Sequence, residues 1–339
     1  MTFSEYKNKY SINLTKQQEQ AVLCTQGQTL LLAVPGSGKT TVTVSRLGYL
    51  VHCLGVPVSQ LLTLTYSVAS CRDMKDRYIK LFGDENVPEF RTINGICSII
   101  IRHFERATGR VAFTLSESEK ESTRILMGLY LRYVGENPSP NDIRDIKSKI
   151  TFARNMLMTT EDIAGSKDFP EGFSQIYDGF RLYKREHRIM DYDDQLEYAY
   201  TILRKYPNIL GYFREKFRYI SVDEAQDTSK LQHEIIKLLA GQCGNIFMVG
   251  DEDQSIYGFR AAYPQALLDF EKTYPDAAVM FIERNFRSTP QITQSAKKLI
   301  DNNSARRKKN MYTERPDGEP IKTVVLGDYE MQADALLSE

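Results

Sequence analysis

The chain has 339 residues, of which 42% are hydrophobic and 26% are charged, a composition typical of a globular protein with one or two domains. Lys plus Arg equals Asp plus Glu, at 44 each, so the formal net charge is zero. The electric field of the whole protein would therefore not attract a polyanion, and a polyanion partner would have to bind in a local basic cleft. Because no secretion signal or membrane-length apolar run occurs, we expect a soluble cytoplasmic protein without a membrane partner.

Cysteine and histidine usage argues against a metal or disulfide framework. The cysteines are scattered without a Cys-x-x-Cys pair, and the four histidines fall at no metal-ligand spacing. We therefore expect reduced thiols and no zinc site. The cysteines are Cys24, Cys53, Cys71, Cys97 and Cys243.

Apolar runs that are bounded by turn residues predict buried parallel strands, because their residues are apolar on both faces. These runs cover 29–34, 60–66, 217–222, 245–250 and 278–282. Helical segments lie between most of them, which predicts an α/β fold with a doubly wound parallel sheet flanked by helices.

The stretch between about 99 and 210 changes to helix-period segments rich in charged and aromatic residues. We predict helices at 120–133, 141–156, 173–188 and 195–205, and interpret them as an all-helical insertion between two strands of the sheet. A last strand-helix unit begins near 278 and leads to a short β-like piece at 321–325. The basic run 306–309 is interpreted as a solvated connector in preference to a DNA contact.

A glycine-rich turn follows the first predicted strand and precedes a helix. Gly36 and Gly38 let the backbone wrap tightly, so that successive N–H groups point at phosphate oxygens. Lys39 would reach the β- and γ-phosphates of ATP, and the hydroxyl of Thr40 would bind Mg²⁺. The pattern departs only at Ala33, where glycine is usual. The predicted phosphate-binding residues are Pro35, Gly36, Ser37, Gly38, Lys39, Thr40 and Thr41.

Three carboxylates are crowded at the end of the strand 217–222. Alone, this run fits an acidic helix N-terminus as well as a metal site. Beside the glycine-rich turn, Asp223 is predicted to hold Mg²⁺ and Glu224 to act as the base that polarises the attacking water. The helix-cap interpretation is kept only for Asp227.

The ordered set of motifs resembles the N-terminal portion of a superfamily 1A DNA helicase of the UvrD/Rep/PcrA type. Besides the two motifs above, the segments that carry the resemblance are 14–18, 61–67 with Met74, 90–95, 190–196, 249–260 and 285–288. The resemblance implies a RecA-like P-loop motor domain at 1–104 and 211–277 and a helical insertion at 105–210. It also implies the start of a second RecA-like domain at 278–339.

The resemblance also assigns roles at the nucleotide. Gln18 would read the adenine edge, Phe286 would stack on the adenine, and Arg287 would reach the γ-phosphate from the second motor domain. The uncharged amide of Gln254 would hydrogen-bond the γ-phosphate or its water and sense their loss. A loop-stabilising amide is the alternative for Gln254, and a surface ion pair is the alternative for Arg287.

Exposed aromatic residues would stack on unpaired bases with little sequence preference. The predicted DNA contacts are Tyr66, Thr92, Asn94, Tyr257, Phe259 and Arg260, with core packing as the alternative for the three aromatic residues. The family usually has Trp at the position of Phe259, His at that of Asn94, and Thr-Asn-Lys-Ala where this chain has residues 67–70. These departures predict weaker single-strand binding.

We therefore predict an ATP- and Mg²⁺-dependent helicase or translocase, of 3′-to-5′ direction by resemblance, that acts on single-stranded DNA or 3′-tailed duplex. A repair or replication protein would be a partner. The family's motifs V and VI have no match here, so we expect a recombinant fragment or a truncated gene product with weak or no activity by itself. The alternatives are the motor part of a helicase-nuclease, a phage-defence ATPase, a nucleotide-gated binding module without unwinding activity, and an unrelated P-loop ATPase.

Overall fold

The computed structural model describes residues 1–339 apart from 117, 242–243, 329–330, 333–336 and 338–339. By its internal contacts the chain divides into two compact units. Unit 1 comprises Met1–Ala33 and Gly38–Ile282, and unit 2 comprises Val34–Ser37 and Glu283–Glu339. The first part of the glycine-rich turn, Val34–Ser37, therefore groups with the C-terminal part of the chain, whereas Gly38 belongs to unit 1.

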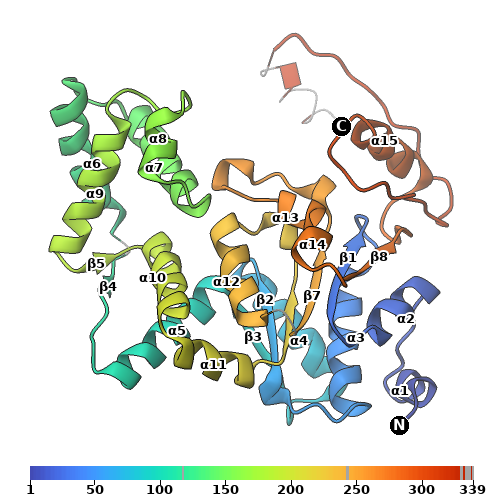
Figure 1. The fold of residues 1–339 in the computed structure, drawn as a ribbon. Coiled ribbons are helices and arrows are strands. Elements are labelled where there is room, and N and C mark those ends of the chain that lie inside the picture. Colours follow the sequence, from blue (N-terminus) through green and yellow to red (C-terminus); the bar gives the residue numbers. More distant parts are fainter. Residues whose placement is uncertain (117, 242–243, 329–330, 333–336, 338–339) are drawn as a thin grey trace. The chain divides into compact units, whose positions relative to one another are not determined.

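Unit 1 is built on a six-stranded sheet in which every neighbouring pair is parallel, with the order β3-β2-β6-β7-β1-β8 (Figure 1). The strands are β1 (Gln28–Ala33), β2 (Leu61–Thr65), β3 (Glu89–Thr92), β6 (Tyr219–Val222), β7 (Asn245–Gly250) and β8 (Ala278–Ile282). The predicted fold class is confirmed. Only β3 has no counterpart among the expected strands, because this short edge strand is half buried and alternates charged with other residues.

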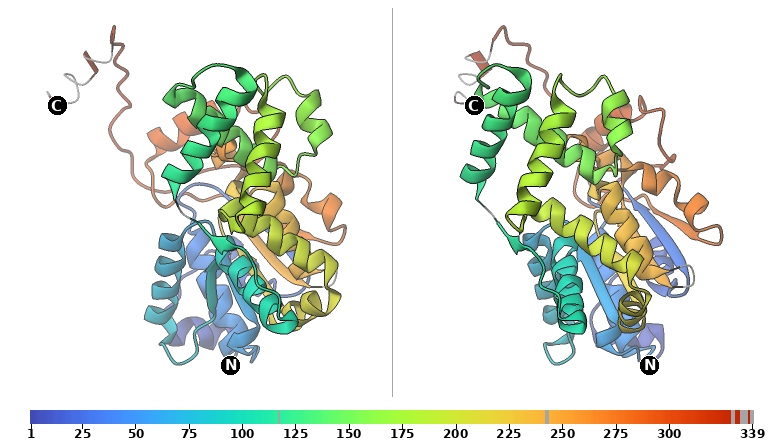
Figure 2. Two further views of the ribbon diagram at one scale, coloured as in Figure 1. Left: turned by 90° about the vertical axis from the view of Figure 1, so that its left-hand side faces the viewer. Right: turned by 60° about the vertical axis from the view of Figure 1, so that its left-hand side comes forward.

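Both faces of the sheet are covered by helices, as Figure 2 shows. Along β1, Leu30 and Leu32 point into one buried cluster, whereas Leu31 and Ala33 point into another, as the two-residue period of a strand requires. The first cluster includes residues of α5 (Ile93–Thr108), α10 (Tyr192–Lys205), α11 (Pro207–Lys216) and α12 (Lys230–Ala240). The opposite face is covered by α2 (Lys16–Leu23), α3 (Lys39–His52) and α4 (Val68–Phe82), and α1 (Phe3–Lys9) packs on α3.

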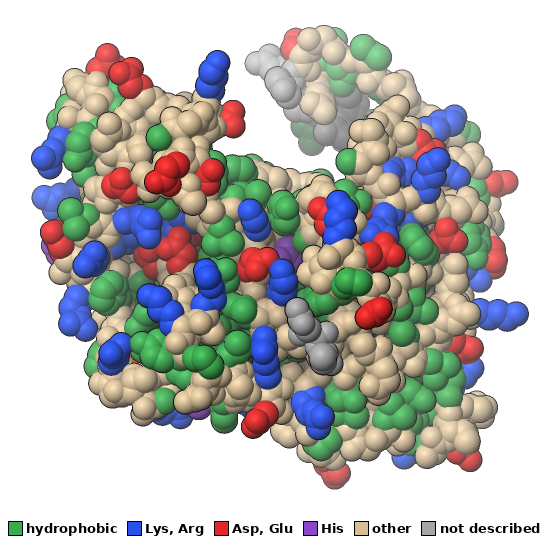
Figure 3. All heavy atoms as spheres, viewed as in Figure 1, with side chains coloured by type: hydrophobic (Ala, Val, Ile, Leu, Met, Phe, Trp, Pro, Cys, Tyr) green, Lys and Arg blue, Asp and Glu red, His purple; other side chains and the backbone are tan. Residues whose placement is uncertain are grey.

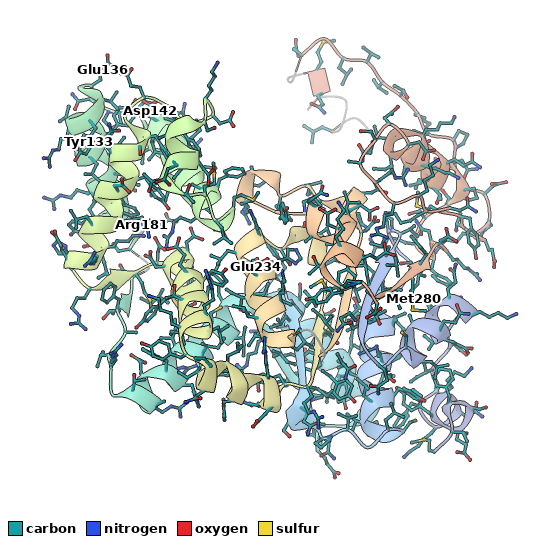
Figure 4. All side chains as sticks on the ribbon, viewed as in Figure 1. Tyr133, Glu136, Asp142, Arg181, Glu234 and Met280 are labelled. Atoms are coloured by element: carbon teal, nitrogen blue, oxygen red, sulfur yellow. The ribbon has the colours of Figure 1, made fainter. Side chains whose placement is uncertain are left out.

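The helical insertion has a small apolar core of its own. The insertion consists of α6 (Glu119–Val134), α7 (Pro140–Asn155), α8 (Thr160–Gly165) and α9 (Phe173–Glu186). The predicted boundaries at 105 and 210 are too wide, because α5 runs through residue 105 and both α10 and α11 pack in the core of the sheet domain. In Figure 4, Tyr133, Glu136 and Asp142 mark the end of the insertion away from the sheet, and Arg181 on α9 lies nearer to α10.

A buried ion network joins the insertion to α10. The guanidinium of Arg154, which is 0% exposed, donates to Glu197 at 2.9 Å and to Asp191 at 3.0 Å, and it also contacts Asp194. From α9, Lys184 donates to Asp191 at 2.6 Å. Buried charges require partners of this kind. The two parallel two-residue strands β4 (Thr114–Leu115) and β5 (Ile189–Met190) lie where the chain enters and leaves the insertion.

The C-terminal region corrects three predictions. Strand β8 pairs with β1, so residues 278–282 complete the first sheet, and unit 2 begins only at Glu283. The expected β-like piece 321–325 is not a strand, since it pairs with no strand in the described part of the chain. The basic run is not fully solvated, because Lys309 is buried and Arg306 pairs with Asp301 at 2.7 Å. The wider division into two RecA-like domains stays a prediction.

The remaining short elements are α13 (Gln265–Leu268), α14 (Phe270–Thr273), α15 (Pro290–Ile300) and the 3₁₀ turns Val58–Gln60, Ala225–Asp227, Glu252–Gln254 and Gly258–Arg260. None of the described helices is long and apolar enough to cross a membrane. Four cysteines are free thiols in the described ranges, and Cys243 lies outside them. The face drawn in Figure 3 shows positive and negative side chains interspersed, as zero net charge would suggest.

Candidate nucleotide and DNA sites

The glycine-rich turn lies between β1 and α3, as the sequence predicts. Ala33 is the last, fully buried residue of β1, so the position where glycine is usual needs no special backbone angle here. Gly36 has φ +67° and Gly38 has φ +84°, a left-handed region that side-chain-bearing residues rarely adopt. Gly38 precedes the first residue of α3 without any side-chain cap, which leaves the helix N-terminus to a ligand such as phosphate.

Within unit 2, the same turn touches the segment that contains Phe286 and Arg287. The N–H of Phe286 donates to the carbonyl of Gly36 at 2.9 Å, and the side-chain oxygen of Asn285 accepts from the N–H of Arg287 at 2.7 Å. A Cβ on Gly36 would lie 2.6 Å from the Cβ of Arg287, so only glycine fits. The structure thus places Arg287 beside the turn, while Arg284 covers the ring of Phe286 at 4.6 Å.

Lys39 and Glu224 form a direct ion pair. The Nζ of Lys39 donates to Oε2 of Glu224 at 2.8 Å, and the lysine side chain is 11% exposed. Glu224 has φ +48°, which is uncommon for a residue with a side chain and costs energy. Two residues predicted to act on the phosphates are therefore brought together, 185 positions apart in the chain.

Asp223 has the properties of a metal ligand. Its side chain is buried at the end of β6, and its Oδ1 has no hydrogen-bond partner. Burial first, and then the charge of Glu224, raises the pKa of Asp223 to about 7. A carboxylate with an unpaired oxygen fits Mg²⁺, which is commonly held by one or two carboxylates together with waters and substrate phosphates. No cluster of three or more metal-ligating side chains occurs among the described residues.

The remaining carboxylate of the acidic run corrects a prediction. Asp227 does not cap a helix, because Ser229 is the cap of α12 and accepts from the N–H of Gln232 at 3.3 Å. Asp227 instead ends the 3₁₀ turn Ala225–Asp227, where burial and the charge of Glu224 raise its pKa to about 6.

A single buried amide connects the ends of β6 and β7. Gln226 is 2% exposed, its Nε2 donates to Oε2 of Glu224 at 2.8 Å, and its Oε1 accepts from the N–H of Asp251 at 3.0 Å. Asp251 in turn accepts from Nε2 of Gln254 at 2.6 Å, and the carbonyl of Gln226 accepts from Ser255 at 3.2 Å. The sequence analysis did not select Gln226, although it lies between two carboxylates of the acidic run.

Both predicted amides of the nucleotide site are engaged within the protein. Gln18 is buried in α2, where its side-chain oxygen accepts from the N–H of Thr15 at 2.9 Å and its nitrogen lies 3.0 Å from the Cβ position of Gly38. This places Gln18 at the start of α3. The hydrogen bond from Gln254 to Asp251 is the loop-stabilising contact named as the alternative, and it leaves the phosphate-sensing role as a prediction.

The predicted aromatic residues form one group at the surface, in which Tyr66 and Phe259 are exposed and Tyr257 is half-buried. The rings of Tyr66 and Tyr257 stack at 5.6 Å with an angle of 15°, and the guanidinium of Arg260 lies 5.5 Å from the rings of both Tyr257 and Phe259. Phe259 is 63% exposed, so core packing is wrong for this residue. Thr92 caps α5 by accepting from the N–H of Gly95 at 3.0 Å.

A cavity of about 440 Å³ adjoins this group, and α7 and α10 contribute residues that the sequence analysis missed. Asn94 lines it and donates to the carbonyl of Tyr192 at 3.2 Å. Of the predicted DNA contacts, the cavity is lined by Tyr66, Asn94, Phe259 and Arg260. The residues not predicted are Lys147, Ser148, Thr151, Asn155, Tyr192, Asp193, Leu196, Asp227, Ser229 and Gln232. Only Tyr192 and its neighbours had a signal, since they lie in the segment 190–196.

A parallel sheet with a glycine-rich turn after β1 and an acidic strand end at β6 defines an α/β protein of the RecA-like motor class. A family model described as the UvrD/REP helicase N-terminal domain matches residues 14–275. The chain belongs to this helicase family. It is 34% identical over 318 residues to the ATP-dependent DNA helicase PcrA of Staphylococcus aureus strain Mu50, and 33% identical over 319 residues to that of Staphylococcus epidermidis. Each match covers 91% of this chain and 43% of the relative.

Proposed function

We propose that this chain is the ATP-binding portion of a DNA helicase or translocase that moves along single-stranded DNA in the 3′-to-5′ direction. The observation that carries the proposal is the contact between Lys39 of the glycine-rich turn and Glu224 of the acidic run. That contact brings together the phosphate-binding lysine and the general base that an ATP-hydrolysing motor requires. The DNA part of the proposal rests on family membership and on the exposed aromatic group.

At the nucleotide, each residue has one task. The turn with Gly36 and Gly38 surrounds the phosphates with backbone N–H groups, and Lys39 leaves Glu224 to neutralise the phosphate charge. Glu224, once released from Lys39, accepts a proton from the attacking water. Asp223 and Thr40 would hold Mg²⁺, which when bound stabilises the charge on the phosphate oxygens.

When Lys39 exchanges its contact with Glu224 for one with phosphate, nucleotide binding can affect the DNA site through connected hydrogen bonds. Glu224 is held by both Lys39 and Gln226, so its release changes the hydrogen bonds of Gln226. Gln226 in turn holds Asp251, the residue that precedes the turn bearing Gln254. The aromatic residues Tyr257 and Phe259 follow within five positions, which makes this chain of contacts the element that both ligands would bias.

The DNA site would hold unpaired bases by stacking. Tyr66, Tyr257 and Phe259 offer ring faces, and the cation of Arg260 above two of these rings suits the phosphate backbone. For 3′-tailed duplex the single-stranded tail would be the loading site. We propose that this portion, which corresponds to 43% of the length of the PcrA relatives, hydrolyses ATP slowly by itself and does not unwind duplex.

The test measures ATP hydrolysis with and without single-stranded DNA, in the parent chain and in Glu224→Gln. We expect DNA to stimulate hydrolysis by the parent, and the variant to bind nucleotide and DNA normally while losing turnover. Lys237→Gln, on an exposed helix position, is the matched control and keeps parental turnover. Equal hydrolysis by Glu224→Gln and the parent would remove Glu224 from the base role. Absence of any DNA effect would favour an ATPase that does not act on DNA.

A further inference from the structure

A second cavity, of about 400 Å³, lies inside the helical insertion. Its walls come from the segment before α6, from α6, α7 and α9, and from the first turn of α10. Its lining residues are Ser116, Ser118, Glu119, Ser122, Leu126, Lys147, Ile150, Thr151, Phe180, Asp191, Tyr192 and Asp193. No motif discussed above assigns a role to its α6 and α9 walls.

The second cavity combines apolar and polar walls in a way that suits a flat heterocycle. Leu126, Ile150 and Phe180 are all buried in the core of the insertion and supply apolar surface. Ser116 and Ser122, whose side chains carry hydroxyl groups, also line the cavity. Apolar contact for a ring face, with a few polar groups for its edge, is the usual design of a site for an organic ring.

Two of the three carboxylates in its wall, those of Asp191 and Asp193, are held by partners within the protein, and the third belongs to Glu119. Asp191 pairs with Arg154 and Lys184, as described above. Asp193 accepts from Thr151 at 2.9 Å and from Asn155 at 2.8 Å. Asp191 therefore faces two cations, and both oxygens of Asp193 are hydrogen-bonded, so neither carboxylate is an unpaired acceptor in the cavity wall.

The second cavity adjoins the cavity beside Phe259. The two share four lining residues, namely Lys147, Thr151, Tyr192 and Asp193. Lys147 is the cation common to both, and its Nζ is held at the hydroxyl of Thr123 at 2.7 Å. A strand with one base in each cavity would place the intervening phosphate charge near this ammonium group.

We propose that the second cavity binds one unpaired nucleobase of the same single strand that stacks at Phe259, with Lys147 against the phosphate between the two cavities. This inference rests on the proposed function, because it extends the DNA site from the sheet domain into the helical insertion. It predicts that α6, α7 and α9 contribute directly to holding the strand.

The first experiment compares Lys147→Met with Lys149→Met by measuring single-stranded DNA affinity over a range of salt concentrations. Lys149 lies on the same helix but pairs with Asp145 at 2.8 Å and lines neither cavity. Losing one phosphate contact should weaken binding and reduce the slope of log affinity against log salt by about 0.7. Lys149→Met should keep the parental slope, and a general structural defect would not change the slope selectively.

The second experiment fills the cavity with Ser122→Phe and scans a single abasic residue along an oligothymidylate. In the parent, one abasic position should weaken binding by about 5- to 150-fold, the range expected for loss of one stacked base. In Ser122→Phe that position should have no further effect, whereas abasic residues at the Phe259 stack should weaken binding as in the parent. Nucleotide affinity, measured in parallel, checks that the sheet domain is folded.

The outcomes separate the inference from the proposed function. This inference alone is overturned under three conditions together: the parent chain binds single-stranded DNA, Ser122→Phe shows the parental abasic profile, and Lys147→Met shows the parental salt slope. A parental response in either one of the two variants overturns the corresponding half, the base cavity or the phosphate contact. A parent chain that binds no single-stranded DNA overturns both the proposed function and the inference.

Discussion

Replacing Gln226 with methionine should uncouple DNA binding from ATP hydrolysis. The methionine side chain has about the same length and keeps the packing, but it removes the donor to Glu224 at 2.8 Å and the acceptor of the Asp251 N–H at 3.0 Å. Because Gln226 and Asp251 are both buried, water does not readily replace these bonds. A lost acceptor at such a site costs roughly 1–3 kcal/mol, or about 5- to 150-fold in a step that depends on it.

The assay is steady-state ATP hydrolysis at saturating nucleotide, with and without a long oligothymidylate. We expect Gln226→Met to bind nucleotide like the parent and to lose most of its stimulation by DNA. Gln226→Glu is the matched variant, since it keeps an oxygen for the Asp251 N–H but places a carboxylate against Glu224. Repulsion between the two carboxylates should lower hydrolysis both with and without DNA. Parental stimulation by DNA in Gln226→Met would refute the connecting role of this amide.

Two further predictions concern stability. Burial holds the pKa of His233 at about 4 against an unfolded value of 6.5, so the unfolded state binds a proton that the folded state does not over that interval. The free energy of unfolding should therefore fall by up to roughly 3 kcal/mol as pH drops from 6.5 to 4, and denaturation midpoints should fall with it. His233→Leu should flatten this pH dependence. The same pH dependence in His233→Leu and the parent would contradict the role of His233. Arg154→Met should destabilise the chain by roughly 3 kcal/mol in urea unfolding because three carboxylates lose their buried partner, whereas the exposed Arg181→Met should cost under about 1 kcal/mol. Equal midpoints for these two variants would argue against the network.

The sheet and the nucleotide residues were predictable because their signals are local. A few consecutive residues are enough to recognise a buried strand that ends in a glycine-rich turn, or a strand that ends in carboxylates. Because the strands are parallel, their carboxyl ends meet at one edge of the sheet. The ion pair between Lys39 and Glu224 follows from that topology. The edge strand β3 escaped prediction because it lacks an apolar run.

The DNA cavity was only half predictable, since its second wall depends on how the insertion packs. Lys147 and Thr151 belong to an amphipathic helix whose sequence carries no motif. The face of this helix that meets α10 is set by long-range contacts, namely the ion network around Arg154 and the hydrogen bonds to Asp193. The helix-cap interpretation that was kept for Asp227 is wrong for a similar reason. Asp227 and Ser229 are both good cap residues, and the 3₁₀ turn after Glu224 decides between them.

The central claim is that one connected structure binds nucleotide at Lys39 and DNA at the exposed aromatic group. The affinity of the chain for a fluorescent oligothymidylate, measured without nucleotide, with ADP and with a non-hydrolysable ATP analogue plus Mg²⁺, tests it most directly. We predict that the dissociation constants differ between these states by about 5-fold or more, as for typical coupled sites. Three identical dissociation constants, with nucleotide shown to be bound, would contradict the account.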